Sequence, residues 1–357
     1  MNRAARATID SAALRANLRA LRGDRAARIM AVIKADGYGH GIVPVARALA
    51  EADAFAVARL EEGVSIRKAG LTNRVVLLEG LFHPEQMKLA AQLDLELVVH
   101  APEQLAMLDS APPGHRYPVW LKLDTGMNRL GFEPASAAEL AHRLRNCAAV
   151  RGPANLMTHL ANADDPDDPA TKAQLGLFAD VVQGLPGERT IANTAGMLAW
   201  PDSAADWVRP GIGLYGVSPF SHDTGADLGL RPVMTLASEL IAVKTVPAGS
   251  RVGYGGVWTA PSPTRIGVAA IGYGDGYSRH LGNGTPVRIG DAICRIVGRI
   301  SMDMITIDLG AVPDAQVGDE VLLWGEGLPV ETLARRAGTI PYELLCGVTR
   351  RVAMRVV

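Results

Sequence analysis

The sequence lacks several features that would assign it to particular classes of protein. It has no apolar run approaching about 18 residues, so no membrane-spanning helix is expected. Its charges nearly cancel, with 36 Lys and Arg against 37 Asp and Glu, which argues against nucleic acid or an anionic membrane as a partner. Its three cysteines, Cys147, Cys294 and Cys346, are widely spaced and form no CxxC or Cys/His cluster. They are expected to be reduced structural thiols, and no metal site is expected.

The amino-terminal stretch also lacks the long apolar region and small-residue cleavage site of a secretory signal. It leads into a strand-like segment and then a helical pattern from Ser11 to about Leu21, with Ser11 as the expected N-cap. Together with the reduced cysteines, this predicts a cytoplasmic protein that is not exported.

The length of 357 residues predicts roughly two domains. In residues 1–229, short apolar runs alternate with amphipathic segments. The expected strands are Ile29 to Ile33, Ala54 to Ala58, Val75 to Leu78, Leu95 to Val99, Val119 to Leu123, Ala154 to Met157, Arg189 to Ala192 and Ile212 to Tyr215. The expected helices between them include Pro84 to Leu93, Pro102 to Leu108, Ser136 to Leu144 and Thr171 to Leu185. This alternation favours a parallel (β/α)8 barrel of the TIM type, with a doubly wound open sheet as the alternative.

In residues 230–357, the pattern changes to valine- and isoleucine-rich segments separated by Gly, Pro and Asp, which predicts a mostly antiparallel β domain. The expected strands are Met234 to Val246, Arg265 to Ile271, Pro286 to Ile289, Ile293 to Ile300, Met304 to Leu309, Glu320 to Trp324 and Val352 to Val357. Only Val330 to Ala337 has a clear helical pattern.

A lysine stands where the first expected barrel strand meets a glycine-rich turn, in Ala31 to Gly41. Burying an unpaired ammonium is costly, so Lys34 is expected to be paired, lowered in pKa, or bound to an aldehyde as a Schiff base. The alternative is a strand-end lysine whose amine reaches solvent. Tyr38 and the flexible glycines around it favour a site for an anionic cofactor.

Other polar residues follow later barrel strands, where the active sites of such barrels lie. Lys122 and Arg129 end and follow the fifth strand, and His159 follows the sixth. Thr194 after the seventh strand and the amides near Gly211 are where barrels of this kind commonly hold a phosphate. Taken singly, each of these residues could be structural.

Arg209 is a permanent cation, and beside a pyridine nitrogen it would keep that nitrogen unprotonated. In the β domain, Tyr254 and Tyr273 lie among glycines, but neither stretch opens a helix after a strand, so the nucleotide signal is weak. The stretch 301–303 and Tyr342 complete the polar candidates.

These residues occur in motifs that closely resemble those of the alanine racemase family, whose members use pyridoxal 5'-phosphate. The motifs are AVIKADGYGHG at 31–41, KLDTGMNRLGF at 122–132, THLANAD at 158–164, ANTAG at 192–196, RPGIGLYG at 209–216, VGYGG at 252–256, IGYGDGY at 271–277, SMD at 301–303 and the tyrosine of PYE at 342. They follow the family order over almost the whole chain.

The resemblance implies a role for each matching residue. Lys34 would hold the cofactor and act as the base on the D-alanine side, and Tyr254 would be the opposing base for L-alanine. The phosphate would be bound by Tyr38, Thr194, Gly211, Ile212 and Tyr342. Arg209 would face the pyridine nitrogen, and His159 would link Arg209 to the tyrosine. The substrate carboxylate would contact Arg129 and Met302, and the access route would be lined by Tyr273 and Asp303. Lys122, often carbamylated in the family, would orient Arg129. Serine is commoner at position 194, but threonine keeps the hydroxyl.

The resemblance also implies a homodimer with shared active sites, because the residues matching Tyr254, Met302 and Asp303 come from the second subunit in the family. The activity would supply D-alanine for peptidoglycan or degrade it. A broader-specificity amino-acid racemase stays open as an alternative, as does, with less support, a non-catalytic pyridoxal-phosphate carrier. A pyridoxal-phosphate decarboxylase of similar architecture would favour an acidic residue in place of Arg209.

Overall fold

The structure is a computed structural model that describes residues 4–357. The chain folds into two compact units. The barrel unit contains Asn17–Leu214 and Pro219–Asp223. The β unit contains the stretch from residue 4 to Ala16, Tyr215–Ser218 and Thr224–Val357. The predicted domain boundary between 229 and 230 stays a prediction, and the two units are described in turn.

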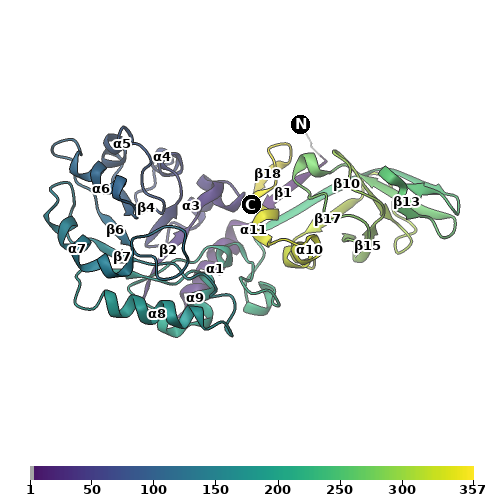
Figure 1. Ribbon diagram of the computed structural model, residues 1–357. Coiled ribbons are helices and arrows are strands. Elements are labelled where there is room, and N and C mark those ends of the chain that lie inside the picture. The colour runs from purple at the N-terminus through teal and green to yellow at the C-terminus, as the bar shows by residue number, and fades with distance from the viewer. Residues whose placement is uncertain (1–3) are drawn as a thin grey trace. The chain divides into compact units, whose positions relative to one another are not determined.

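Eight parallel strands close into a barrel in the barrel unit (Figure 1). In order they are β2 (Arg28–Val32), β3 (Ala54–Val57), β4 (Arg74–Leu77), β5 (Leu95–Val99), β6 (Val119–Lys122), β7 (Asn155–Met157), β8 (Arg189–Thr190) and β9 (Trp207–Val208). The last strand pairs with the first, Ile29 lying opposite Val208. The predicted (β/α)8 barrel is therefore confirmed, and the open-sheet alternative is wrong.

Helices surround these strands (Figure 1). They are α2 (Lys34–Tyr38), α3 (Ile42–Ala48), α4 (Leu60–Lys68), α5 (Gln86–Gln92), α6 (Pro102–Asp109), α7 (Ala137–Asn146), α8 (Ala170–Val181) and α9 (Thr194–Ala199), together with the part of α1 (Ser11–Arg22) from Asn17 onward. In α7, Leu140, Ala141 and Leu144 are buried. This spacing of three to four residues puts them on one face of the helix, toward the strands.

Two local predictions in this part of the chain are wrong. The apolar run Ile212–Tyr215 is a 3-10 helix, and the eighth strand is the shorter β9, which ends immediately before Arg209. The N-cap of α1 is Asp10 rather than Ser11, because Oδ1 of Asp10 accepts hydrogen bonds from the backbone N–H groups of Ala12 and Ala13 at 2.7 and 2.9 Å.

A cluster of charged and aromatic side chains lies at the amino-terminal ends of the barrel strands. The guanidinium groups of Arg28 and Arg74 lie 4.2 and 4.7 Å from the centroid of the Trp207 ring. The carboxylate of Glu188 contacts both arginines and accepts a hydrogen bond from the Trp207 indole at 2.8 Å. Side chains thus fill this end of the barrel, and the carboxyl-terminal ends of the strands carry the candidate site.

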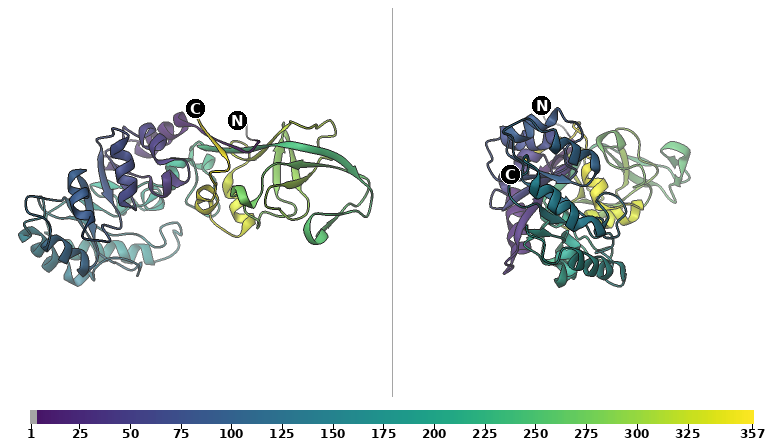
Figure 2. Two further views of the ribbon diagram at one scale, coloured as in Figure 1. Left: turned by 90° about the horizontal axis from the view of Figure 1, so that it is seen from above. Right: turned by 60° about the vertical axis from the view of Figure 1, so that its left-hand side comes forward.

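The β unit contains an eight-stranded sheet that curls back on itself (Figures 1 and 2). The strand order is β13-β16-β15-β14-β17-β10-β1-β18, and β13 also pairs with β10. The strands are β1 (Arg6–Ile9), β10 (Met234–Val246), β13 (Thr264–Ala269), β14 (Pro286–Ile289), β15 (Ala292–Ile296), β16 (Ile305–Asp308), β17 (Glu320–Trp324) and β18 (Ala353–Val356), with β11 (Arg251–Val252) and β12 (Trp258–Thr259) forming a separate hairpin. The prediction of a mostly antiparallel β domain is confirmed.

The amino-terminal strand belongs to this sheet although it lies far from its partners in sequence. Arg6 lies opposite Ala237 of β10 in antiparallel pairing and opposite Ala353 of β18 in parallel pairing. The predicted helix at Val330–Ala337 is confirmed as α10, and a second helix, α11 (Pro341–Cys346), was not predicted. Within residues 4–357, no helix combines the length and apolar character needed to cross a bilayer.

Candidate active site

Lys34 follows the barrel strand β2 and opens a turn of unusual handedness. The four residues after it have positive φ angles: 54° at Ala35, 53° at Asp36, 63° at Gly37 and 52° at Tyr38. These residues form one turn of left-handed helix, in which the Gly39 N–H donates to the Ala35 carbonyl at 3.0 Å. Such a conformation costs about 1–2 kcal/mol for each residue other than glycine, and strain of this kind tends to occur at functional sites.

Neighbouring groups hold this left-handed turn in place. Oδ1 of Asp36 accepts a hydrogen bond from the Ile42 N–H at 2.8 Å, and the Asp36 carbonyl accepts one from the Gly41 N–H at 2.8 Å. Burial lowers the pKa of His40 to about 4, so its ring is neutral, and Nδ1 donates to the Tyr38 carbonyl at 2.8 Å. The turn therefore fixes the direction of both Lys34 and Tyr38.

Replacing Gly37 by alanine is expected to destabilise the protein by about 1–3 kcal/mol and to weaken cofactor binding. Its φ is +63°, and an added Cβ would lie 3.0 Å from Cγ2 of Val45. Gly70→Ala is the matched control, because Gly70 has a φ of +81° but no atom within 4 Å of an added Cβ. Thermal melting and cofactor titration of both variants check the prediction. Equal cofactor affinity in the two variants would contradict it.

Lys122, at the end of β6, is only 7% exposed and lies among other cations. Burial and the charges of Arg209, Arg129 and Lys34 lower the pKa of Lys122 to about 8. Near that pH, a substantial share of its amine is neutral and nucleophilic. The surplus of positive charge suits an anionic ligand.

The shifted pKa of Lys122 predicts a pH dependence of stability. Between its folded pKa of about 8 and the ordinary value of 10.5, the unfolded chain binds this proton and the folded chain does not. The free energy of unfolding should therefore rise with pH across this window, by up to about 3 kcal/mol. Denaturant unfolding of the cofactor-free protein at pH 7 and pH 10, in CO2-free buffer, measures the rise. Lys122→Met should be more stable than the parent at pH 7 and should show a smaller rise; identical profiles would exclude the effect.

A carboxylate organises the loop that carries Arg129. Oδ1 of Asp124 accepts hydrogen bonds from the N–H groups of Gly126 and Asn128, each at 3.0 Å. Burial would raise the pKa of Asp124, but backbone N–H donors from 126–129 outweigh it and hold that pKa below its usual value. The ionised Asp124 thus fixes the loop that ends in the exposed side chain of Arg129.

Arg209 and His159 are joined by a hydrogen bond in the barrel unit. Arg209 is 3% exposed, and its Nη2 lies 3.2 Å from Nδ1 of His159. A guanidinium has only donors, so Nδ1 accepts and the proton of the neutral imidazole is assigned to Nε2. Burial, together with the charges of Arg209 and Lys122, holds the pKa of His159 well below its usual value. This contact is the part between Arg209 and His159 of the predicted link that runs from Arg209 through His159 to Tyr254.

Two hydroxyl-bearing side chains meet at the turn after β9. Thr194 begins α9, and its Oγ1 accepts a hydrogen bond from the Gly211 N–H at 2.9 Å. A Cβ added to Gly211 would lie 2.5 Å from the Tyr38 hydroxyl, so only glycine leaves room for that group. Tyr38, Thr194, Gly211 and the adjacent Ile212 therefore lie together, as expected of a phosphate cradle. The hydroxyls and the cations around Lys122 fit a phosphorylated, aldehyde-bearing cofactor.

The β unit holds the remaining sequence-predicted residues. The Tyr273 N–H donates to the Ser301 carbonyl at 3.1 Å, which joins the loops that carry Tyr273, Met302 and Asp303. Asp303 also forms an ion pair with Arg351 at 2.6 Å. Tyr254 is 67% exposed and Met302 51% exposed, and Tyr342 is half-buried in α11.

Sequence reasoning did not select two buried residues that hold the site. Nε2 of Gln174, in α8, donates to the His159 carbonyl at 3.0 Å, and its Oε1 accepts from the Ala161 N–H at 2.9 Å. Thr190, at the end of β8, accepts a hydrogen bond from Arg209 at 2.7 Å. Neither residue carries a local signal, because a glutamine in an amphipathic helix and a threonine in a strand are ordinary.

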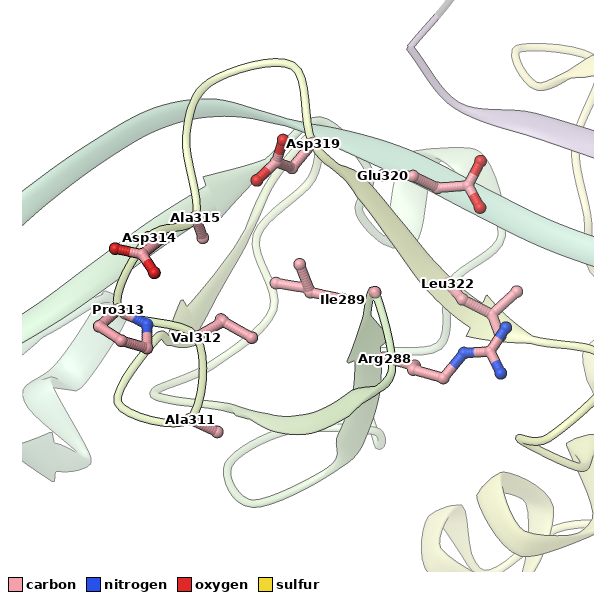
Figure 3. A pocket seen from close by; sticks show the side chains of 11 residues that line it. Arg288, Ile289, Ala311, Val312, Pro313, Asp314, Ala315, Asp319, Glu320 and Leu322 are labelled. Atoms are coloured by element: carbon pink, nitrogen blue, oxygen red, sulfur yellow. The ribbon is translucent and has the colours of Figure 1, made fainter.

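A cavity of about 650 Å³ in the β unit carries none of the sequence-predicted residues (Figure 3). Figure 3 shows Asp314 and Asp319 on one side of it and Arg288 on the other. Among residues 4–357, no group of three or more His, Cys, Asp or Glu side chains is arranged to hold a metal ion.

Comparison with known proteins decides the family. A profile described as "Alanine racemase, N-terminal domain" matches residues 9–219, and one described as "Alanine racemase, C-terminal domain" matches residues 233–356. The chain belongs to the alanine racemase family. A relative named alanine racemase from Shewanella baltica (strain OS195) is 51% identical over 355 residues, covering 99% of each chain. One from Aeromonas hydrophila subsp. hydrophila is 50% identical over 356 residues, covering 99% of this chain and 100% of the relative.

Solved structures of alanine racemases share the whole fold. The biosynthetic alanine racemase from Pseudomonas aeruginosa is 43% identical and matches with a TM-score of 0.95, covering 100% of both chains. The alanine racemase from Acinetobacter baumannii is 37% identical, with a TM-score of 0.93 and the same coverage. The sequence-based assignment to this family is thus confirmed.

Proposed function

We propose that this protein interconverts L-alanine and D-alanine with pyridoxal 5'-phosphate as its cofactor. The observation that carries the proposal is the placement of Lys34 just after the barrel strand β2, immediately before a left-handed turn that carries Tyr38. The hydroxyls of Tyr38 and Thr194 would hold the phosphate, together with the backbone of Gly211 and Ile212 and the phenol of Tyr342. The bound cofactor would withdraw electrons from the substrate and so stabilise negative charge at its Cα.

Racemisation requires a proton to leave one face of Cα and another to arrive on the opposite face. We propose Nζ of Lys34 as the base for D-alanine and the Tyr254 phenolate oxygen as the base for L-alanine. A positive charge near the Tyr254 oxygen would favour its role as the base. The buried cation of Arg209, reached through the Nε2–H of His159, is the proposed source.

Arg129 and the Met302 region would hold the substrate carboxylate, and Tyr273 and Asp303 would line the access route. Alongside burial, the charge of Arg129 lowers the pKa of the neighbouring Lys122, so an anion in place of that amine would turn repulsion into attraction. The neutral amine of Lys122 can attack CO2, forming an N–C bond and releasing a proton, and the resulting carbamate would pair with Arg129. A pKa of about 8 supplies the reactive neutral amine.

The direct test is an absorbance spectrum of the purified protein, followed by incubation with L-alanine in heavy water and chiral analysis. A visible cofactor band, lost on borohydride treatment or in Lys34→Ala, together with deuterated D-alanine, supports the proposal. The band without D-alanine would point to another amino acid or to the carrier function. The absence of a band after addition of pyridoxal phosphate would overturn the proposal.

We further propose that the active form is a homodimer in which each site combines the barrel unit of one subunit with Tyr254, Met302 and Asp303 of the other. The marked exposure of Tyr254 and Met302 in the single chain supports this arrangement. Their exposure leaves both side chains available for contact with a second subunit.

The shared-site proposal predicts that two inactive proteins rescue each other. Mixing Lys34→Ala and Tyr254→Phe subunits should give heterodimers in which one site carries both changes and the other site carries none. With random pairing, about a quarter of the parent activity should return. Subunit exchange is followed with two affinity tags, and each variant mixed with itself is the control. Heterodimers that form but remain inactive would show that each chain builds its own site.

A further inference from the structure

Thr190 lies fully buried against Arg209, and its hydroxyl forms hydrogen bonds in two directions. Nη1 of Arg209 donates to its Oγ1 at 2.7 Å, and Oγ1 in turn donates to the Trp207 carbonyl at 3.1 Å. A hydroxyl has a single hydrogen. Because the Trp207 carbonyl takes that hydrogen, Oγ1 presents a lone pair to Arg209.

The other acceptors of Arg209 gather on its second terminal nitrogen. Nη2 donates to the carbonyls of Thr158 and Ile191 at 2.8 and 2.9 Å and also lies 3.2 Å from Nδ1 of His159. Three acceptors share the two hydrogens of this nitrogen. A planar guanidinium held at one nitrogen alone can pivot about it, whereas contacts at both Nη1 and Nη2 fix the plane.

Neutral groups, rather than carboxylates, hold Arg209. Among the ion pairs of residues 4–357, none involves this side chain, and its hydrogen-bond acceptors are carbonyls, a hydroxyl and an imidazole nitrogen. Its charge is therefore not cancelled locally, and burial alone lowers its pKa to about 10. The direction in which this charge acts depends on how the guanidinium is oriented.

We propose that the Thr190 hydroxyl is a positioning group that fixes the guanidinium plane of Arg209 and so directs its charge toward the cofactor ring. This inference rests on the proposed function, since it takes the cofactor to lie beside Arg209. The other possible role of Thr190 is simple packing in the strand β8.

Two substitutions distinguish a positioning role of Thr190 from a packing role, because the two roles predict that different variants are the more damaged. Thr190→Val keeps the branched shape and removes the acceptor for Nη1. Thr190→Ser keeps the hydroxyl and removes a buried methyl group. Positioning predicts that Val is the damaging change, whereas packing predicts that Ser is.

The experiment compares the parent, Thr190→Val and Thr190→Ser as full-length proteins loaded with pyridoxal phosphate. Hydrogen bonds to charged groups have energies that correspond to changes of about 10- to 100-fold. We expect Thr190→Val to lose kcat by about that factor with KM changed less than about threefold, and the absorption maximum of its bound cofactor to shift without substrate. Thr190→Ser should keep kcat within about threefold and should retain the parent spectrum. Thermal melting of the cofactor-free proteins reports packing separately.

A Val variant with the parent spectrum and kcat, or a Ser variant damaged as much as Val, would overturn the positioning role. If Val melts far below the parent, Thr190→Ala is the second hydroxyl-free variant and should show the same spectral shift. Failure of the proposed function has a different signature, since the parent itself would then show no cofactor band. A parent that binds cofactor without racemising alanine still allows the spectral comparison.

Discussion

The Tyr254→Phe protein is expected to lose racemisation by about 10²–10⁴-fold while it still exchanges the α-proton of D-alanine with solvent. Lys34 alone would serve the D-alanine face, so the proton that it removes can return as deuterium from heavy water. The phenol that serves the L-alanine face is missing, so L-alanine should neither exchange nor convert at an appreciable rate. Mass spectrometry of each enantiomer after chiral separation measures exchange and conversion together.

The exposed position of Tyr254 means that this substitution should not disturb the folding of the chain. The side chain is 67% exposed in a short 3-10 turn (Tyr254–Gly256), so removal of its hydroxyl leaves no buried gap in the chain. Unchanged thermal melting and an unchanged cofactor band are the controls. If both enantiomers lost exchange equally, Tyr254 would not act on one face alone, and the two-base assignment would be wrong.

Replacing Arg209 by glutamate is expected to slow racemisation by about 10²–10³-fold and to raise absorbance at long wavelength during turnover. Arg209 cannot give up its proton readily, so it would leave the cofactor nitrogen unprotonated. A glutamate there would share a proton with that nitrogen and make the ring a stronger electron sink. The substitution would also remove the cation that helps to lower the pKa of His159 and of Lys122.

Arg209→Lys is the matched control for this change. Lysine keeps a positive charge at this position but lacks the two terminal guanidinium nitrogens that donate to Thr190, Thr158 and Ile191. We expect slower racemisation without the rise in long-wavelength absorbance. If the Glu and Lys proteins had the same spectrum, the charge at this position would not set the electronic behaviour of the cofactor.

The barrel could be predicted from the sequence because its strands are buried apolar runs separated by amphipathic helices. The prediction was wrong at the eighth strand, where β9 has only two residues and the apolar run Ile212–Tyr215 forms a 3-10 helix instead. Hydrophobic periodicity cannot distinguish a strand from a 3-10 helix in apolar runs this short. The pairing of β1 with β10 and β18 joins segments more than 200 residues apart, and no local pattern marks such a contact.

Candidate site residues could be selected from the sequence where they occur in distinctive motifs, as with Lys34, Arg209 and Tyr254, and their roles stay predictions. The structure adds the left-handed turn after Lys34, which only the backbone angles reveal. It also adds the buried residues Thr190 and Gln174, which form hydrogen bonds with other candidate site residues. Their contacts, with Arg209 and with the His159 carbonyl, depend on how strands and helices pack, and a single sequence does not record that packing.

The gathering of Lys34, Lys122, Arg129 and Arg209 has a consequence for the life of the protein in a cell. Mutual repulsion among these cations makes the barrel less stable before its anionic ligand arrives, and ligand binding raises the free energy of unfolding by mass action. With pyridoxal phosphate as the proposed ligand, the amount of folded protein would be tied to the supply of that cofactor. If that supply fell, newly made chains would be degraded faster, and the abundance of the enzyme would follow the availability of the proposed cofactor.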